Sequence, residues 1–486
     1  MAAAPRARAL LVVPPLLKYS AGPLLGPTLL VAAARAAGHE ADVLDLSIRW
    51  IREHLPQIPG AAESPFVGDH DKPGALLSSL QRDVFTPLLR AHLTDVDDTS
   101  SADPHLTLTC SHDAVDEAVV RLAGSSTGRW IRDLLAEQSR PDVLGVSVLF
   151  SGQVLLGLAT SYLARALWPG VQIVWGGPHV TALQDRIARE PRFGRFVDAF
   201  VFGYAERTFV EMLDAVALGA ALPRACVRPG SGEACRATDD ASHAPSFQDL
   251  DLYGIPHLTL PAQASRGCSY GRCEFCTYPA IEGEYRPLDE AVIEPVIALA
   301  ATRGANVAFK DSLLLPKRLF ALADRIAGRA RWSACTKLSA SLDADALRRL
   351  RRGGCATLEV GLETIDPEHQ RLIAKRQSVP LFLRTLDAAA EAEIGLVINY
   401  ITGFPGQDPE AAARELDWLR GEIARRPGLH ALVEHNEFQL ERLSPMVPNA
   451  RSHGLAITGE WPWSSVLGWR MVAEERKRTR LQVVTQ

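Results

Sequence analysis

The chain has 486 residues, a length at which one hydrophobic core usually divides, so we expect two or three domains. Its composition, 47% hydrophobic and 22% charged, is typical of a globular protein and excludes a disordered or fibrous one. The formal net charge of −5 gives no case for binding nucleic acid. No apolar stretch reaches the roughly 18 residues of a membrane span, so the sequence predicts a cytoplasmic protein.

The first half of the chain alternates between strand and helix patterns. The apolar run at 9–13 ends at two prolines, which makes it too short for a signal peptide and predicts a buried first strand. A helix at 24–36 and a strand at 41–45 follow. Later come strands at 143–149, 171–175 and 199–202 and helices at 154–167 and 206–218. This alternation predicts a doubly wound, Rossmann-like α/β sheet that binds ligands at the carboxyl ends of its strands.

We expect a first domain at 1–220, interrupted at about 58–140 by an insertion that carries helices near 114–123 and 128–138. Residues 221–250 are loop-like and predict a linker. A second domain at 251–438 and a C-terminal extension at 439–486 complete the chain. In the second domain we expect strands near 258–264, 306–309, 332–337, 356–361, 396–401 and 431–438, with helices between them. Six such units predict a partial (β/α)6 barrel with its site at the carboxyl ends of the strands.

Three of the eight cysteines, Cys268, Cys273 and Cys276, lie within nine residues, directly after the first strand of the second domain. The others are scattered, which favours a local metal site in a reducing compartment over a disulfide framework. Thiolates select zinc or iron–sulfur clusters, and a closed site of either kind usually has four protein ligands. Three local ligands favour a cluster with one open iron. A zinc-stabilised binding module, with His257 as the nearest fourth ligand, is the remote alternative.

The segment 265–276 resembles the radical S-adenosylmethionine superfamily, and the preceding doubly wound domain makes the chain similar to its cobalamin-dependent branch. About 200 residues of the second half carry the resemblance. It implies a [4Fe–4S] cluster on the three cysteines and places Phe275 near the adenine of S-adenosylmethionine. The family spaces its cysteines by three residues and then two, whereas this chain has four and then two.

Further positions match the family and are implied to bind S-adenosylmethionine. Glu363 ends a segment that resembles the family's Gly-Leu-Glu-Ser strand, and Gly403 begins a Gly-Phe-Pro-Gly turn beside the adenine. Asp311 stands in the place of a Phe-x-Asp-Asp motif and is expected to face the cofactor or substrate. Ser341 is a weaker match, as is Lys375, because a polar strand end and a surface lysine explain them nearly as well.

The resemblance also implies that cobalamin binds on the N-terminal sheet. The residues implied to contact it lie in loops after the strands: Ser147, Gly176, Gly177, His179, Gly203 and Glu206. Glycines allow a bulky ligand to approach the backbone closely, although such turns also close many ordinary parallel strands. The Asp-x-His-x-x-Gly motif of other cobalamin proteins is absent. We therefore expect cobalamin to bind base-off, with His179 as a loop contact.

The family resemblance implies a methyltransferase that uses a 5′-deoxyadenosyl radical on an unactivated carbon of a peptide or another secondary metabolite, in natural product biosynthesis. A rearrangement or cyclisation with the same cofactors is the alternative. A reducing partner such as a flavodoxin or ferredoxin is expected, with no nucleic-acid or membrane partner. In the C-terminal extension, Trp461, Trp463 and Trp469 are expected to pack the tail onto the barrel rather than line its mouth.

Overall fold

A computed structural model describes residues 5–15, 21–54, 67, 110–237, 243–254 and 257–472. Most of the predicted insertion at 58–140 lies outside these residues. The chain forms two compact units. Unit 1 comprises residues 1–61, 72–256 and 461–465, and unit 2 comprises the rest. In the described part, no helix is both long and apolar enough to cross a membrane.

Unit 1 is built on a five-stranded sheet in which every pairing is parallel. The order is β2-β1-β3-β4-β5, which confirms the predicted doubly wound fold. Chain direction across the sheet reverses between β1 and β3, the place where such sheets bind ligands. The strands are β1 (Arg8–Val13), β2 (Glu40–Asp45), β3 (Val143–Ser147), β4 (Gln172–Gly176) and β5 (Ala199–Phe200).

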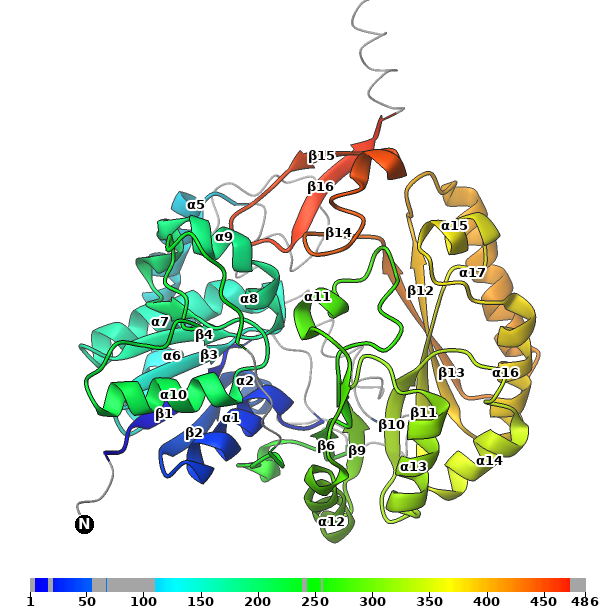
Figure 1. The fold of residues 1–486 in the computed structure, drawn as a ribbon, viewed down its shortest axis with the longest axis horizontal. Helices are drawn as coiled ribbons and strands as arrows, with labels where there is room; N and C mark the ends of the chain where they lie inside the picture. Colours follow the sequence, from blue (N-terminus) through cyan, green and yellow to red (C-terminus); the bar gives the residue numbers. More distant parts are fainter. Residues whose placement is uncertain are drawn as a thin grey trace, which may run out of the picture. The chain divides into compact units, whose positions relative to one another are not determined.

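The helices of unit 1 cover both faces of this sheet (Figure 1). Because right-handed crossovers from β1 to β2 and from β3 to β4 run in opposite directions, α1 and α7 lie on opposite faces. Helix α10 packs on α1, whereas α5 and α6 pack on α7. The helices are α1 (Leu25–Ala36), α2 (Leu46–His54), α5 (His112–Ala123), α6 (Ser126–Ala136), α7 (Val154–Leu167), α8 (Pro178–Ala182), α9 (Gln184–Arg189) and α10 (Glu206–Ala217).

Unit 2 contains a six-stranded parallel sheet in the order β13-β12-β11-β10-β9-β6. Strands that follow one another in the chain are therefore neighbours, which is the arrangement of the predicted partial barrel. The strands are β6 (Thr259–Ala262), β9 (Asn306–Phe309), β10 (Trp332–Thr336), β11 (Cys355–Glu363), β12 (Gly395–Thr402) and β13 (Ala431–Glu437). Since every crossover runs in one direction, the helices cover one face and leave the other for a site.

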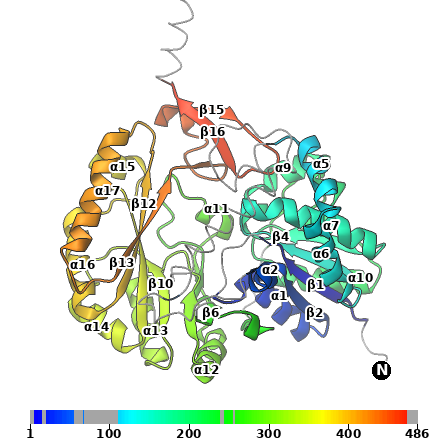
Figure 2. The same ribbon diagram turned by 180° about the vertical axis from the view of Figure 1, so that it is seen from behind.

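The connecting helices of unit 2 lie along the outer face of this sheet, as both views show (Figures 1 and 2). They are α12 (Glu294–Arg303), α13 (Pro316–Ile326), α14 (Ala344–Arg352), α15 (Pro367–Leu372), α16 (Val379–Ala392) and α17 (Pro409–Ala424). Proline occupies the first turn of α12, α13, α15, α16 and α17. It is favoured there because its missing N–H has no partner within the helix.

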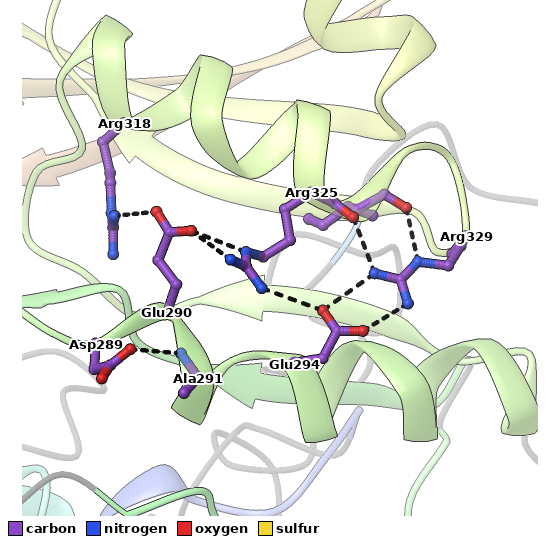
Figure 3. Close-up of polar contacts among 8 residues, drawn as sticks. Asp289, Glu290, Ala291, Glu294, Arg318, Arg325 and Arg329 are labelled. Carbon is purple, nitrogen blue, oxygen red and sulfur yellow. Dashed lines mark hydrogen bonds and ion pairs between the residues drawn. The ribbon is translucent and has the colours of Figure 1, made fainter.

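An ion-pair network joins the start of α12 to α13 (Figure 3). Glu290 accepts from Arg318 at 2.6 Å and from Arg325 at 2.7 Å, and Glu294 accepts from Arg329 at 2.7 Å. Arg318 also donates to the carbonyl of Ala264 at 3.1 Å, just beyond β6. The network therefore fixes the segment that leads into the cysteine loop.

The C-terminal extension contributes a three-stranded antiparallel sheet to unit 2. Its strands are β14 (Leu440–Glu441), β15 (Leu455–Gly459) and β16 (Val466–Met471), with β16 in the centre. Trp469 packs on Phe438 with ring centroids 5.5 Å apart, in the same cluster as Phe404. The expected packing of Trp469 on the barrel is thus observed. Trp463 differs, because residues 461–465 belong to unit 1.

Candidate functional site

The three clustered cysteines lie in the loop between β7 (Ser265–Arg266) and α11 (Tyr278–Glu282). All three side chains are partly buried and none forms a disulfide. The backbone N–H of Cys276 donates to the carbonyl of Cys273 at 3.2 Å, which makes a tight turn between them. The fold therefore presents three free thiols beyond the carboxyl end of the first barrel strand.

Two carboxylates hold the backbone that leads into this loop. Asp311, which is only 2% exposed, accepts from the N–H of Ala264 at 3.0 Å and from the hydroxyl of Ser265 at 2.6 Å. Glu282 accepts from the N–H of Gly267 at 3.1 Å and from the hydroxyl of Ser312 at 2.6 Å. Burial raises the pKa of both carboxyls to about 6.

These contacts give Asp311 a structural role. Its carboxylate accepts from the backbone of Ala264 and Ser265, because a carboxylate buried beside N–H groups accepts their hydrogen bonds. Asp311 therefore supports the backbone that leads to Cys268, and its expected role toward the cofactor or substrate stays a prediction.

Glu363 and Lys375 form a buried ion pair at the end of β11. Their Oε1 and Nζ atoms are 2.9 Å apart, and the two side chains are 7% and 16% exposed. Glu363 has a φ of 68°, a left-handed conformation that is uncommon for glutamate and is often found at functional sites. A Cβ on Gly361 would lie 2.3 Å from the Glu363 carboxylate and 2.5 Å from Nζ of Lys375. A side chain at position 361 would therefore displace this ion pair.

Two lysines lie close to the thiols. Burial raises the pKa of Cys273, while the nearby ammonium of Lys375 lowers it, and Lys337 acts in the same direction. Lys337 donates to the carbonyl of Lys375 at 3.0 Å, and its Nζ lies 3.4 Å from the ring centroid of Tyr270. Burial raises the pKa of Cys276 to about 12. Cations beside buried thiols favour the thiolate, which is the form that binds metal.

Two predicted positions meet in one apolar cluster. Phe275 packs edge-on against Phe404 with ring centroids 6.3 Å apart, and Phe404 directly follows Gly403. Gly403 has a φ of 78° and donates its N–H to Gln407 at 2.7 Å. The structure thus brings the turn after β12 against the cysteine loop, in agreement with the two matches.

Ser341 lies apart from these residues. It is exposed in the turn after β10, where its hydroxyl is 2.7 Å from that of Ser339. Among the described contacts, none joins Ser341 to the cysteines or to Glu363. Its predicted role in binding S-adenosylmethionine therefore receives no support from its position.

In unit 1 the predicted loop residues gather at the carboxyl ends of β3, β4 and β5. Ser147 is paired with Gly176 across β3 and β4. Gly177 has a φ of 110°, and a Cβ there would lie 2.4 Å from the carbonyl oxygen of Val148. The hydroxyl of Thr181 accepts from the N–H of Gly203 at 3.0 Å and so joins the turns after β4 and β5.

The two remaining positions of this set are buried. Glu206 is 2% exposed at the start of α10. His179 is 5% exposed in α8, and its Nε2 lies 2.9 Å from the carbonyl oxygen of Trp463. All six residues therefore lie in or beside the loops where doubly wound sheets bind ligands.

Sequence reasoning undervalued the supporting residues of the cysteine loop. Lys375 was interpreted as a weak match or a surface lysine, yet it is the ion-pair partner of Glu363. Tyr270 and Lys337 were not singled out, although the hydroxyl of Tyr270 donates to the carbonyl of Ala374 at 2.5 Å. Spacing alone carried no signal for these contacts because the residues come from separate segments of the chain.

The donor set fits an iron–sulfur cluster that leaves one iron open. Within the described residues, no group of three or more His, Cys, Asp or Glu side chains converges on a point where one metal ion could be held. Ligands of a cubane bind different iron atoms and do not need to converge in this way. Cys268, Cys273 and Cys276 would hold such a cluster, and the carboxylate of Glu363, at the end of β11, lies close enough to Cys273 to raise the pKa of its thiol.

Comparison with protein families finds two matching domains. Residues 263–419 match the radical SAM superfamily model, and residues 129–213 match the B12 binding domain model. These regions include the barrel strands β9 to β12 and the sheet strands β3 to β5. The domain order is the one that the cysteine motif and the doubly wound sheet predicted.

One curated relative is an uncharacterized methyltransferase, PH0819, from Pyrococcus horikoshii. It is 25% identical over 292 residues, which are 56% of this chain and 62% of the relative. The match thus spans less than two thirds of that protein.

Two solved structures share the fold over nearly the whole chain. The radical S-adenosylmethionine methyltransferase TsrM from Kitasatospora setae, solved with cobalamin and a [4Fe–4S] cluster, matches with a TM-score of 0.59 and 16% identity. The match covers 93% of this chain and 78% of TsrM. The cobalamin-dependent S-adenosylmethionine radical enzyme OxsB matches with a TM-score of 0.62 and 12% identity, over 96% of this chain and 64% of OxsB.

Proposed function

We propose that this chain, which combines a B12-binding domain with a radical S-adenosylmethionine domain, is a cobalamin-dependent radical S-adenosylmethionine methyltransferase. The finer proposal is methyl transfer to an unactivated carbon of a peptide or another secondary metabolite. The methyltransferase names of PH0819 and TsrM support the reaction class. The observation that carries the proposal is the juxtaposition of three free thiols with two lysines, one of them paired with Glu363.

Each part of this arrangement has a distinct task. The three thiolates would hold the [4Fe–4S] cluster, and the missing fourth ligand would leave one iron for S-adenosylmethionine. When bound, the cluster supplies the electron that cleaves S-adenosylmethionine to methionine and a 5′-deoxyadenosyl radical. Glu363 provides a fixed carboxylate for a cationic group of that cofactor. Phe275 and Phe404 provide apolar surface beside it, which helps to exclude water.

The turns of unit 1 would hold cobalamin. Their glycines leave the backbone open to a large flat ligand. The hydrogen bond between Thr181 and Gly203 joins the turns after β4 and β5, and these two turns form the surface that the ligand would contact. The cluster must receive an electron before each cleavage of S-adenosylmethionine, so we also propose a reducing partner such as a flavodoxin or ferredoxin. A radical rearrangement or cyclisation is the second candidate, because both cofactors also fit that chemistry.

The test uses the reconstituted full-length protein with reduced hydroxocobalamin and S-adenosylmethionine that carries a deuterated methyl group. A methyltransferase is expected to transfer the label to the corrinoid, which mass spectrometry detects as a gain of one CD3 group. Formation of 5′-deoxyadenosine without labelled corrinoid would contradict methyl transfer and favour the rearrangement. A Gly177→Ala variant with weakened cobalamin binding is expected to lose the label while it retains the iron–sulfur cluster.

A further inference from the structure

Five residues of the C-terminal extension, Trp461–Ser465, belong to unit 1 although the strands on either side of them, β15 and β16, belong to unit 2. Trp463 is 3% exposed. Its ring contacts those of Phe193 at 4.6 Å and Trp175 at 5.6 Å between centroids, with Phe200 and His112 slightly further away. A distant segment of the chain therefore completes an aromatic cluster in unit 1.

This cluster lies at the carboxyl ends of β4 and β5. Trp175 is the penultimate residue of β4, and Phe200 is the last residue of β5. The turns that follow these strands carry Gly177 and Gly203, which we propose to contact cobalamin. The inserted segment is thus adjacent to the proposed cobalamin loops of unit 1.

His179 links the segment to these loops. Its Nε2 is 2.9 Å from the carbonyl oxygen of Trp463. Because a carbonyl can only accept, Nε2 must carry the proton. The backbone N–H of His179 also donates to the carbonyl of Val148 at 3.3 Å. The histidine therefore connects the turn after β4 both to the loop after β3 and to the inserted segment.

Packing is the main interaction that stabilises the Trp461–Ser465 segment in unit 1. The indole Nε1 of Trp463 is buried and has no hydrogen-bond partner among the residues that the structure describes, a loss that aromatic contacts and burial must outweigh. Arg186 of α9 adds a polar contact, donating to the carbonyl of Trp461 at 3.4 Å. Apolar burial thus holds the Trp463 ring, and the contacts of His179 and Arg186 with the carbonyls of Trp463 and Trp461 fix the position of the backbone.

We infer that His179 is a positioning residue that fixes the turn after β4 for cobalamin by donating its Nε2–H to the inserted Trp461–Ser465 segment. The claim that the turn binds cobalamin rests on the proposed function. The claim that His179 holds the Trp461–Ser465 segment rests only on contacts within unit 1. It differs from axial ligation of cobalt, since Nε2 is already engaged by a carbonyl. The C-terminal extension therefore takes part in forming the cobalamin loop.

The test compares His179→Ala, His179→Gln and Trp463→Ala in the full-length protein. Hydrogen exchange of residues 176–182, measured without cobalamin, is expected to quicken about tenfold in His179→Ala, since loss of one hydrogen bond costs about 1.4 kcal/mol. It is expected to quicken at least as much in Trp463→Ala, because that variant removes the aromatic packing that holds the segment in place. His179→Gln, which keeps an N–H donor, is expected to restore most of the protection. Unchanged exchange in His179→Ala would overturn the docking role.

Hydroxocobalamin affinity provides the second measurement. We expect it to fall about tenfold in His179→Ala and to recover in His179→Gln. The electron paramagnetic resonance spectrum of bound cob(II)alamin is expected to be the same in wild type and His179→Ala. A nitrogen coupling present in wild type and absent from His179→Ala would make the residue an axial ligand and overturn the inference. If wild type binds no cobalamin, the proposed function fails, whereas the exchange result still decides the docking.

Discussion

Nζ of Lys375 lies 2.9 Å from Oε1 of Glu363, and both side chains are largely buried. Burial raises the pKa of the Cys273 thiol, and the ammonium of Lys375 opposes that rise. The same ammonium group therefore pairs with the carboxylate proposed to bind S-adenosylmethionine and favours the thiolate proposed to bind iron. This coupling makes Lys375 the residue whose removal should affect both functions.

Lys375→Met is expected to lower the free energy of unfolding by about 3 kcal/mol, because it leaves the buried Glu363 carboxylate without its partner. The double variant Glu363→Gln/Lys375→Met should regain much of this loss, since the unpaired charge is gone. Urea unfolding of the single and double variants measures the difference. Equal stability of Lys375→Met and wild type would show that the pair is not formed.

Glu363→Gln alone tests the cofactor role. The amide keeps the shape of the side chain but removes its charge, so affinity for S-adenosylmethionine should fall at least tenfold if the carboxylate binds a cationic group. Isothermal titration of the cluster-loaded protein measures this. Glu391→Gln, on the exposed surface beside Arg348, is the control and should leave the affinity unchanged.

Gly177→Ala should destabilise unit 1 by about 1–3 kcal/mol, because alanine disfavours a positive φ and its Cβ would meet the carbonyl of Val148 at 2.4 Å. Gly176→Ala is a matched control, since its Cβ would lie 3.5 Å from the carbonyl oxygen of Val201, an ordinary contact. Urea unfolding measures both variants. Equal effects of the two substitutions would contradict the structural account of this turn.

Glu282 predicts a pH dependence of stability. Burial raises its pKa from 4.5 to about 6 in the folded protein, so its contribution is fully present below pH 4.5 and is lost as pH rises through 6. Glu282→Gln should remove this decline between pH 4.5 and 6.5, as thermal unfolding at several pH values would show. Glu294→Gln provides a control of opposite sign, because a hydrogen bond from Arg329 lowers the pKa of Glu294. An unchanged slope in Glu282→Gln would refute the assignment.

Glu290 joins Arg318 and Arg325 between the start of α12 and α13. Glu290→Gln should lower the free energy of unfolding by about 1 kcal/mol, because a network with a largely buried arginine contributes more than a single exposed pair. Glu391→Gln serves again as the control, with an expected change near zero. Urea unfolding distinguishes the two, and a loss of equal size in both would argue against the network.

The spacing of apolar residues predicted most helices and strands, because buried positions recur at the regular periods of each element. The helix expected at 154–167 coincides with α7, and the strand expected at 306–309 coincides with β9. Short elements such as α8 and α15 were missed because five or six residues give too little periodicity. Polar stretches of the C-terminal extension gave no pattern for β14 to β16.

The candidate site was predictable where chemistry is local and not where it depends on contacts between segments. Three cysteines in one loop are visible in any reading of the sequence. The pairing of Lys375 with Glu363 and the bonds of Asp311 to the backbone arise from folding. Trp463 shows the same limit, since its aromatic partners in unit 1 lie more than 260 residues earlier in the chain.

The central claim is that Cys268, Cys273 and Cys276 hold an open cluster that cleaves S-adenosylmethionine. After anaerobic reconstitution, wild type and the control Cys226→Ala, a buried cysteine of unit 1, are expected to bind about four iron and four sulfide ions per chain. With S-adenosylmethionine and titanium(III) citrate, both should form 5′-deoxyadenosine, and Cys273→Ser should not. Stoichiometric zinc, no cluster absorption and no 5′-deoxyadenosine from wild type would contradict the account.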